Sequence, residues 1–305
     1  MNPYRLRAYG LLLIVALIWG IASPIIKFTL GGIPALPFLT YRFGLSAVVA
    51  LILMLATSLR LPKHVNFWQL ILYSFLTSTV SLGLLFLGLE KTTVLDATLI
   101  SAVSPLLVAL AGVMYLREHI TTREKIGMGI AFLGTLITII EPVLRNGIAA
   151  SQLRGNILVL GYLLASTWSA VLAKKLIREG AHEIILTNYS FVVGFVTILP
   201  LTIFFYGIAP FAQSLSSLQF PYHTGVWFMA LVSGTLAYTL WARAQKTIEI
   251  GEAGLFAYLS PIFAAPLAVI WLKESVTPTF IISAILITIG VLIAEYKKSR
   301  YNKAS

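Results

Sequence analysis

Ten long apolar segments constrain this chain more than any other feature of its sequence. A run of about 18 or more mostly apolar residues is long enough to cross the hydrocarbon core of a bilayer as an α-helix. Such runs occupy residues 9–30, 34–57, 68–89, 94–116, 123–141, 155–178, 183–206, 224–247, 252–272 and 278–296. In lipid, every backbone polar group must be bonded within the protein, which favours helices. The sequence therefore predicts an all-α integral membrane protein with ten transmembrane helices, in which 207–223 is the longest external loop.

The composition excludes a soluble enzyme. Of the 305 residues, 58% are hydrophobic and only 11% are charged, whereas soluble chains carry about 25% charged residues. The chain has no cysteine, which excludes disulfides, thiolate metal sites and a cysteine nucleophile.

The basic residues predict the orientation of the chain. Sixteen of the 22 Lys and Arg residues fall on the side of the N-terminus, if the first segment is a retained helix rather than a cleaved signal. The other six are Lys27, Arg42, Lys91, Arg145, Arg154 and Lys273. By the positive-inside rule, both termini of this multi-pass protein are expected in the cytoplasm, and the cytoplasmic membrane is its expected location. The net charge of +11 then needs no nucleic-acid partner, and the bilayer is the expected macroscopic partner.

The sequence also repeats itself. The first copy contains Asp96-Ala97, Ser104-Pro105, Leu116-Arg117-Glu118, Thr121 and Gly134. The second, 156 residues later, contains Glu252-Ala253, Ser260-Pro261, Leu272-Lys273-Glu274, Thr277 and Gly290. Trp19-Gly20 and Trp168-Ser169 match more weakly. We therefore divide the chain into two five-helix halves, 1–150 and 151–305. Because five is odd, the second half should enter the membrane from the opposite side, an arrangement that recurs in secondary transporters.

These motifs resemble the EamA-type branch of the drug/metabolite transporter superfamily over essentially the whole chain. The resemblance rests on Ala16-Leu17-Ile18-Trp19-Gly20, Lys27, Arg42 and the paired Ser-Pro and Leu-basic-Glu elements. It implies two inverted halves around a central cavity, and export of small metabolites such as amino acids or related compounds.

Polar and aromatic side chains in the middle of the segments are the candidate substrate contacts. Hydroxyls donate and accept hydrogen bonds, and indole and phenol rings combine apolar faces with a polar tip. The alternative is that these residues only pack or bond neighbouring helices. The candidates are Trp19, Ser23, Ser101, Ser104, Trp168, Tyr238, Tyr258 and Ser260. They favour a neutral or zwitterionic substrate.

The few charged residues within the segments define a second hypothesis. Arg42 is a candidate for either a structural role or an anion contact, and Lys27 is close enough to a helix end to snorkel. Together they could serve a carrier for anionic metabolites. Asp96 opens the fourth segment, where it could cap the helix. No carboxylate or histidine occupies a mid-membrane position in the sequence.

The two Ser-Pro elements predict helix distortions. Pro105 and Pro261 cannot donate a backbone hydrogen bond, so each frees the carbonyl four residues earlier, at Ser101 and Ala257. These distortions could be hinges for alternating access or static kinks.

Other functional classes find little support. The sequence holds no nucleophile–base pair, no metal-binding motif and no nucleotide-binding motif, so no enzymatic activity, metal or cofactor is expected. A channel should show a charged or carbonyl-rich filter and is a less favoured alternative. We therefore predict a secondary transporter with a small-molecule substrate, and the oligomeric state, including a homodimer, stays open.

Overall fold

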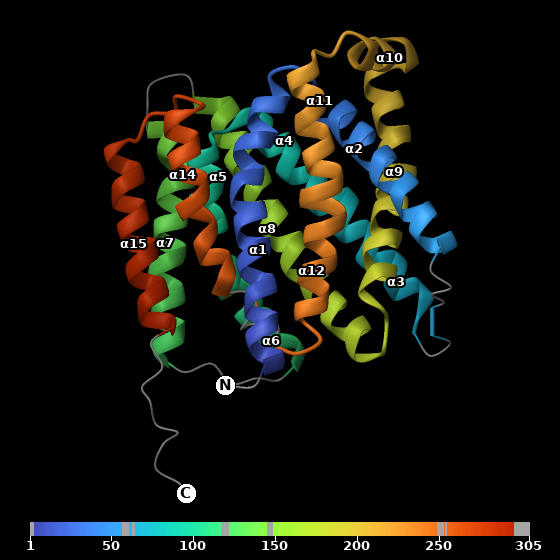
Figure 1. The fold of residues 1–305 in the computed structure, drawn as a ribbon. Coiled ribbons are helices and arrows are strands. Elements are labelled where there is room, and N and C mark those ends of the chain that lie inside the picture. Colours follow the sequence, from blue (N-terminus) through green and yellow to red (C-terminus); the bar gives the residue numbers. More distant parts are fainter. Residues whose placement is uncertain are drawn as a thin grey trace, which may run out of the picture.

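The computed structural model describes residues 3–56, 61–62, 65–116, 122–144, 149–248, 253 and 255–295, and these residues form a bundle of helices (Figure 1). The helices of the first half are α1 (Pro3–Leu30), α2 (Ala35–Ala56), α3 (Phe67–Ser74), η1 (Phe75–Leu82), α4 (Gly83–Lys91), α5 (Val94–Ser101), α6 (Ser104–Leu116) and α7 (Thr122–Leu144). Those of the second half are α8 (Ala149–Arg178), α9 (Glu183–Tyr206), α10 (Ile208–Ser216), α11 (Phe220–Trp227), η2 (Phe228–Leu236), α12 (Ala237–Ala244), η3 (Leu255–Leu259), α14 (Ser260–Ile270) and α15 (Pro278–Glu295).

Six helical stretches of the described residues are long and apolar enough to cross a membrane, so the chain is an all-helical, multi-pass membrane protein. They are Tyr4–Leu30, Ala35–Ala56, Phe67–Lys91, Ser151–Arg178, Glu183–Tyr206 and Phe220–Ala244. Three shorter apolar helices, Val94–Val108, Phe256–Ile270 and Pro278–Ile293, lie within three further predicted segments. The beginning of α1 and the end of α15 lie at the same end of the bundle (Figure 1).

The segment predicted as an external loop at 207–223 contains a helix. Gly207 adopts a positive φ of 81° after α9, and α10 follows it. No residue of α10 is buried, and Figure 1 shows the helix lying across the end of the bundle opposite to the start of α1. Helix α10 is too short and too mixed in composition to form a long apolar run, so the apolar pattern does not predict it.

Equivalent elements of the two halves resemble each other locally. The third predicted segment contains the π-helical stretch η1, and the eighth contains the π-helical stretch η2. The pairs α2 with α9, α5 with α14, and α7 with α15 each pack side by side. A duplicated fold whose halves meet around a common axis has this arrangement of neighbours.

The Ser-Pro elements open new helices in both halves. In the first half, α5 ends at Ser101, a turn follows at Ala102 and Val103, and α6 begins at Ser104. In the second half, the 3₁₀-helix η3 gives way to α14 at Ser260, so that Pro261 lies in its first turn. Proline is tolerated there because the first amides of a helix have no partner within it. The predicted distortions are therefore breaks in the helices.

The start of α5 differs from the prediction that Asp96 caps this helix. Thr93 precedes the helix, and its hydroxyl accepts a hydrogen bond from the Asp96 amide at 3.0 Å. The buried Asp96 carboxylate instead accepts from Nε2 of Gln152 at 2.8 Å and Nδ2 of Asn156 at 3.3 Å, both on α8. Because the helix begins at Val94, Asp96 lies in its first turn, where the side chain reaches the neighbouring helix.

A lysine in each half binds the carbonyls at the end of a helix. Nζ of Lys27 on α1 donates to the carbonyls of Leu89 and Thr92 at 2.7 Å each. Nζ of Lys174 on α8 donates to the carbonyls of Gln245 and Ile248 at 2.9 and 2.8 Å. The two pairs of carbonyls are separated by the 156 residues of the sequence repeat. This correspondence extends the repeat to a contact that the motifs did not reveal.

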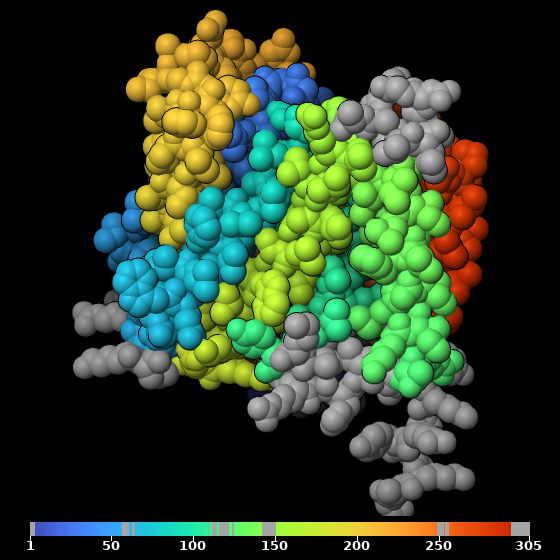
Figure 2. Space-filling view, turned by 180° about the vertical axis from the view of Figure 1, so that it is seen from behind, coloured from blue at the N-terminus to red at the C-terminus, as the bar shows by residue number. Residues whose placement is uncertain are grey.

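Helix α8 links both halves on the face shown in Figure 2. It runs between the cyan α3–α4 region and the green α7, and it packs against both α4 and α7. Gly88 and Gly155 permit the close approach of α4 and α8, since a methyl group added at Gly155 would lie 2.9 Å from the Gly88 carbonyl oxygen. Of the repeat motifs, Arg117, Glu118, Thr121 and Glu252 lie outside the described residues, as do Arg60, Lys63, Arg145 and the basic residues after 296.

Candidate functional site

A cavity of about 230 Å³ lies between the two halves of the chain. The first half contributes residues of α1, α2, α3, η1, α4, α5 and α6, and the second half contributes residues of α8, η2, α12, η3 and α14. Both helix breaks meet this cavity, because Ser101, Ala102 and Ser104 line it from one half and Ala257, Ser260 and Pro261 from the other. The irregular backbone therefore lies where it borders a hollow within the protein, which is where membrane proteins tolerate it.

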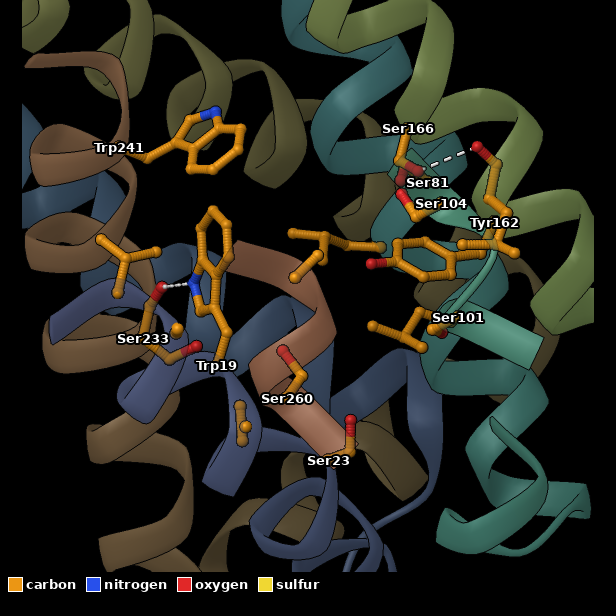
Figure 3. A pocket seen from close by; sticks show the side chains of 18 of the residues that line it. Trp19, Ser23, Ser81, Ser101, Ser104, Tyr162, Ser166, Ser233, Trp241 and Ser260 are labelled. Carbon is orange, nitrogen blue, oxygen red and sulfur yellow. Dashed lines mark hydrogen bonds between the residues drawn. The ribbon is translucent and has the colours of Figure 1, made fainter. Parts of the chain in front are cut away.

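Aromatic rings form one side of the cavity. The Trp19 ring lies 5.2 Å from that of Tyr238, edge to face, and 5.4 Å from that of Trp241. Nε1 of Trp19 donates to the carbonyl of Ser233 at 3.1 Å, which joins α1 to η2 (Figure 3). This hydrogen bond satisfies the polar atom of the indole and leaves its apolar surface for contact with a ligand.

Hydroxyl groups gather on the other side. Figure 3 shows Ser81, Ser101, Ser104, Tyr162 and Ser166 across the cavity from Trp19 and Trp241. Ser23 of α1 and Ser260 of α14 also line the cavity (Figure 3). Each hydroxyl can donate and accept a hydrogen bond, so this wall suits a ligand with both kinds of polar group.

Arg42 is the one charged residue among the described residues that line the cavity. Its side chain is 1% exposed, and Nε and Nη1 have no hydrogen-bond partner in the described part of the protein. Its neighbours are aromatic: Cζ lies 5.6 Å from the centre of the Phe43 ring and 5.4 Å from that of Phe86. A guanidinium in these surroundings keeps its positive charge without a carboxylate to balance it.

The cavity can bind and orient a molecule but holds no general acid–base pair. None of its described lining residues is Asp, Glu or His. No cluster of three or more His, Cys, Asp and Glu side chains occurs among the described residues. The chemistry of the site is therefore recognition through hydroxyls, aromatic faces and one cation.

Comparison with known families identifies the chain. The EamA-like transporter family matches residues 6–140 and again residues 153–296. The chain belongs to the EamA-like transporter family. These two matched ranges, the EamA segments, cover almost the whole chain, and residues of both segments line the cavity. Membership makes the protein a transporter rather than an enzyme, and two EamA matches indicate a duplicated repeat.

Several EamA-like relatives align along nearly their whole length. An uncharacterized transporter of Bacillus subtilis, YyaM, is 24% identical over 95% of this chain and 94% of its own. A probable amino-acid metabolite efflux pump of Salmonella typhimurium is 22% identical over 93% of both chains. A solved crystal structure shares the fold with a TM-score of 0.65 and 16% sequence identity, over 94% of this chain and 96% of the other.

Most of the predicted site residues line the EamA cavity. The ones that do are Trp19, Ser23, Arg42, Ser101, Ser104, Tyr238 and Ser260. Trp168, Tyr258 and Lys27 are not among the lining residues. Trp168 is 38% exposed, and its ring lies edge to face with that of Tyr115 at 5.3 Å. The Lys27 ammonium is bound to backbone carbonyls.

Helical phase explains which residues of α8 the sequence analysis missed. Tyr162, Ser166, Ser169 and Ala173 line the cavity at intervals of three and four residues, so they share one face of the helix. Trp168 lies outside that stripe. The regular spacing of tyrosine, serine and alanine was the signal available in the sequence, whereas Trp168 is predicted only from its position as an aromatic residue in the middle of the segment 155–178. The sequence analysis also missed Trp241 on α12, which lies three residues after Tyr238 and so shares its face of the helix.

Proposed function

We propose that this protein is a secondary transporter that exports amino acids or related neutral or zwitterionic metabolites by alternating access. The observation that carries the proposal is the cavity between the two EamA segments, with aromatic rings on one side and hydroxyls on the other. Substrate sites in transporters built from repeats lie at the interface between the repeats. The Salmonella relative named as a probable amino-acid metabolite efflux pump supports the substrate class.

The proposed transport cycle uses an inverted topology. We propose ten crossings, two halves at 1–150 and 151–305, and both termini in the cytoplasm. The equivalent π-helical stretches and helix breaks in the two halves support it, because exchange of two alternative conformations between such halves opens the cavity first to one side and then to the other.

The distribution of charge disfavours a carrier that needs both Arg42 and Lys27. The ammonium of Lys27 already donates to two carbonyls at the end of α4, and Lys27 does not line the cavity. Arg42 alone is left to meet a negatively charged group, which fits a substrate with one such group better than a multiply charged one.

The two repeat-related tryptophans provide the test. In counterflow with purified protein in liposomes, labelled amino acids should enter vesicles loaded with the same unlabelled compound, and the flux should saturate. Trp19→Ala removes a ring of the cavity wall, so we expect flux to fall about tenfold or more, as for an aromatic contact worth over ~1.4 kcal/mol. Trp168→Ala is the matched control, since it removes an equally large ring outside the cavity. Equal loss in both variants, or no saturable flux, would contradict the proposal.

A further inference from the structure

We infer that Arg42 binds the carboxylate of the transported compound, so that a free carboxylate is the feature this transporter selects. The inference rests on the proposed function and names a chemical requirement for its substrate. It begins from a buried cation that lines the cavity and has two donor nitrogens without a partner in the described part of the protein.

The surroundings of Arg42 make a purely structural ion pair an inadequate explanation. An arginine within a membrane segment normally pairs with a carboxylate or with backbone carbonyls, because burial of an unpaired charge costs several kcal/mol. The carboxylates described elsewhere in the protein have other partners. Glu90 accepts from the Ala35 amide, Asp96 accepts from Gln152 and Asn156, and Glu141 accepts from Thr277. Glu179 is paired with Lys175, Glu183 is paired with Lys246, and Glu274 accepts from the Val94 and Leu95 amides.

Packing holds the guanidinium in place from several sides. The rings of Phe43 and Phe86, both fully buried, lie 5.6 and 5.4 Å from Cζ. Gly234 of η2 also faces it, since a methyl group added there would lie 3.7 Å from Nη2. A positioned guanidinium of this kind presents parallel N–H groups that match the two oxygens of a carboxylate.

The number of charges distinguishes a carboxylate from a phosphate. A phosphate group carries close to two negative charges at neutral pH, whereas Arg42 is the one cation among the described lining residues. One carboxylate of the substrate would neutralise the charge of Arg42. The ammonium group or side chain of the same substrate would then contact the hydroxyl and indole groups of the cavity walls.

Binding and transport can be measured separately. The probes are the twenty common amino acids, short monocarboxylates such as lactate, and the carboxamides of the same amino acids. The first readout is the rise in melting temperature of the purified protein with each probe, and the second is counterflow in liposomes. For the wild type, we expect carboxylates to stabilise the protein and to compete at concentrations about tenfold or more below those of their amides, which lack the charge-assisted hydrogen bonds.

Three variants test the residue. Arg42→Gln should abolish the preference for acid over amide. Arg42→Lys keeps the positive charge but lacks the parallel N–H groups of the guanidinium, so it should retain part of the preference. Without ligand, Arg42→Gln should melt at the same temperature as the wild type or higher, because it removes an unbalanced buried charge. Thr40→Val is the control, since Thr40 lies two residues earlier on α2 and bonds Thr202 on α9 rather than lining the cavity; it should keep the preference.

The outcomes separate the two claims. Carboxylates that stabilise the wild type but not Arg42→Gln, without counterflow of any probe, would support the inference and contradict the proposed function. Counterflow with equal preference for acids and amides, or an Arg42→Gln variant that keeps the preference, would overturn the inference and leave the transporter standing. Failure of every carboxylate to stabilise the wild type, or a lower melting temperature in ligand-free Arg42→Gln, would also overturn it.

Discussion

Individual buried charges in this protein have distinct tasks that their positions in the sequence do not reveal. The sequence offers both Lys27 and Arg42 as candidates for an anion contact. The structure places the Lys27 ammonium on the carbonyls of Leu89 and Thr92, and it places the Arg42 guanidinium beside the cavity. The difference depends on which helices surround each side chain, which a single sequence does not specify.

The role of Lys27 predicts an effect on stability rather than on selectivity. Lys27→Met removes two charge-assisted hydrogen bonds at the end of α4, and we expect a loss of about 2–4 kcal/mol in the free energy of unfolding. Lys91→Met, at an exposed position of the same helix end, should have little effect. Unfolding in detergent measures both variants. A change in the preference for acids over amides in Lys27→Met, with stability unchanged, would contradict this role.

Glu274 joins the two halves at the end of the bundle where α4 ends and α5 begins. Its carboxylate oxygens accept from the amides of Val94 and Leu95 at 2.7 and 2.9 Å. Burial raises the pKa of Glu274 above its ordinary value of 4.5, although both amides and Lys27 act in the opposite direction and Asp96 adds to the rise. The folded protein therefore binds this proton more tightly than the unfolded chain does.

The sign of that shift predicts a pH dependence. As pH falls from 7 towards the ordinary pKa of 4.5, protonation of Glu274 favours the folded state, so the wild type should gain stability relative to Glu274→Gln, which does not titrate. Melting temperatures of the two proteins across this range measure the difference. A difference that stays constant, or that changes in favour of Glu274→Gln at low pH, would be incompatible with the raised pKa.

The positions of the long helices could be predicted from the sequence more completely than the residues of the site. Apolar length located α1, α2, α8 and α9, because a membrane segment must be both long and apolar. It did not reveal the π-helical stretches or α10, since neither changes the average hydropathy of a long window. The Ser-Pro elements did predict distortions, because a proline cannot continue the hydrogen bonding of a helix interior, and each proline lies in the first turn of a new helix.

Contact between α7 and α15 depends on a pair of glycines that the repeat aligns. A methyl group added at Gly290 would lie 2.6 Å from the carbonyl oxygen of Gly127, and one added at Gly134 would lie 3.0 Å from that of Ser283. Each glycine therefore allows its helix to approach the backbone of the other closely.

Gly290→Ala should consequently destabilise the protein by about 1–3 kcal/mol, because backbone rather than a flexible side chain must move. Gly129→Ala on α7 is the matched control, since no atom lies within 4 Å of the added methyl group; its higher helix propensity should leave stability unchanged or raise it by up to ~1 kcal/mol. Unfolding of both variants in detergent is the measurement. Equal stability of the two variants would show that this helix contact is not close in the membrane.

For the whole molecule, the internal repeat was the most informative feature of the sequence. It led to the prediction of two halves, and the resemblance to EamA-type transporters implied a central cavity. The described residues form a cavity that both EamA segments line. Seven predicted site residues meet there, whereas Trp168 and Tyr258 do not line it. The spacing of the motifs reveals the repeat in the sequence. Which face of each helix borders the cavity depends on how the two halves pack, and a single sequence does not specify this.

The central claim is that this cavity opens alternately to the two sides of the membrane. Because the chain has no native cysteine, Ser23→Cys places a single thiol at the cavity for labelling by a membrane-impermeant maleimide in vesicles of known orientation. We predict labelling from either side, with a saturating substrate slowing both reactions, and no vesicle leak of the maleimide through the protein. Passage of the maleimide through the protein into the vesicles would indicate a pore. A thiol that reacts from neither side, or at the same rate with and without substrate, would contradict alternating access through this cavity.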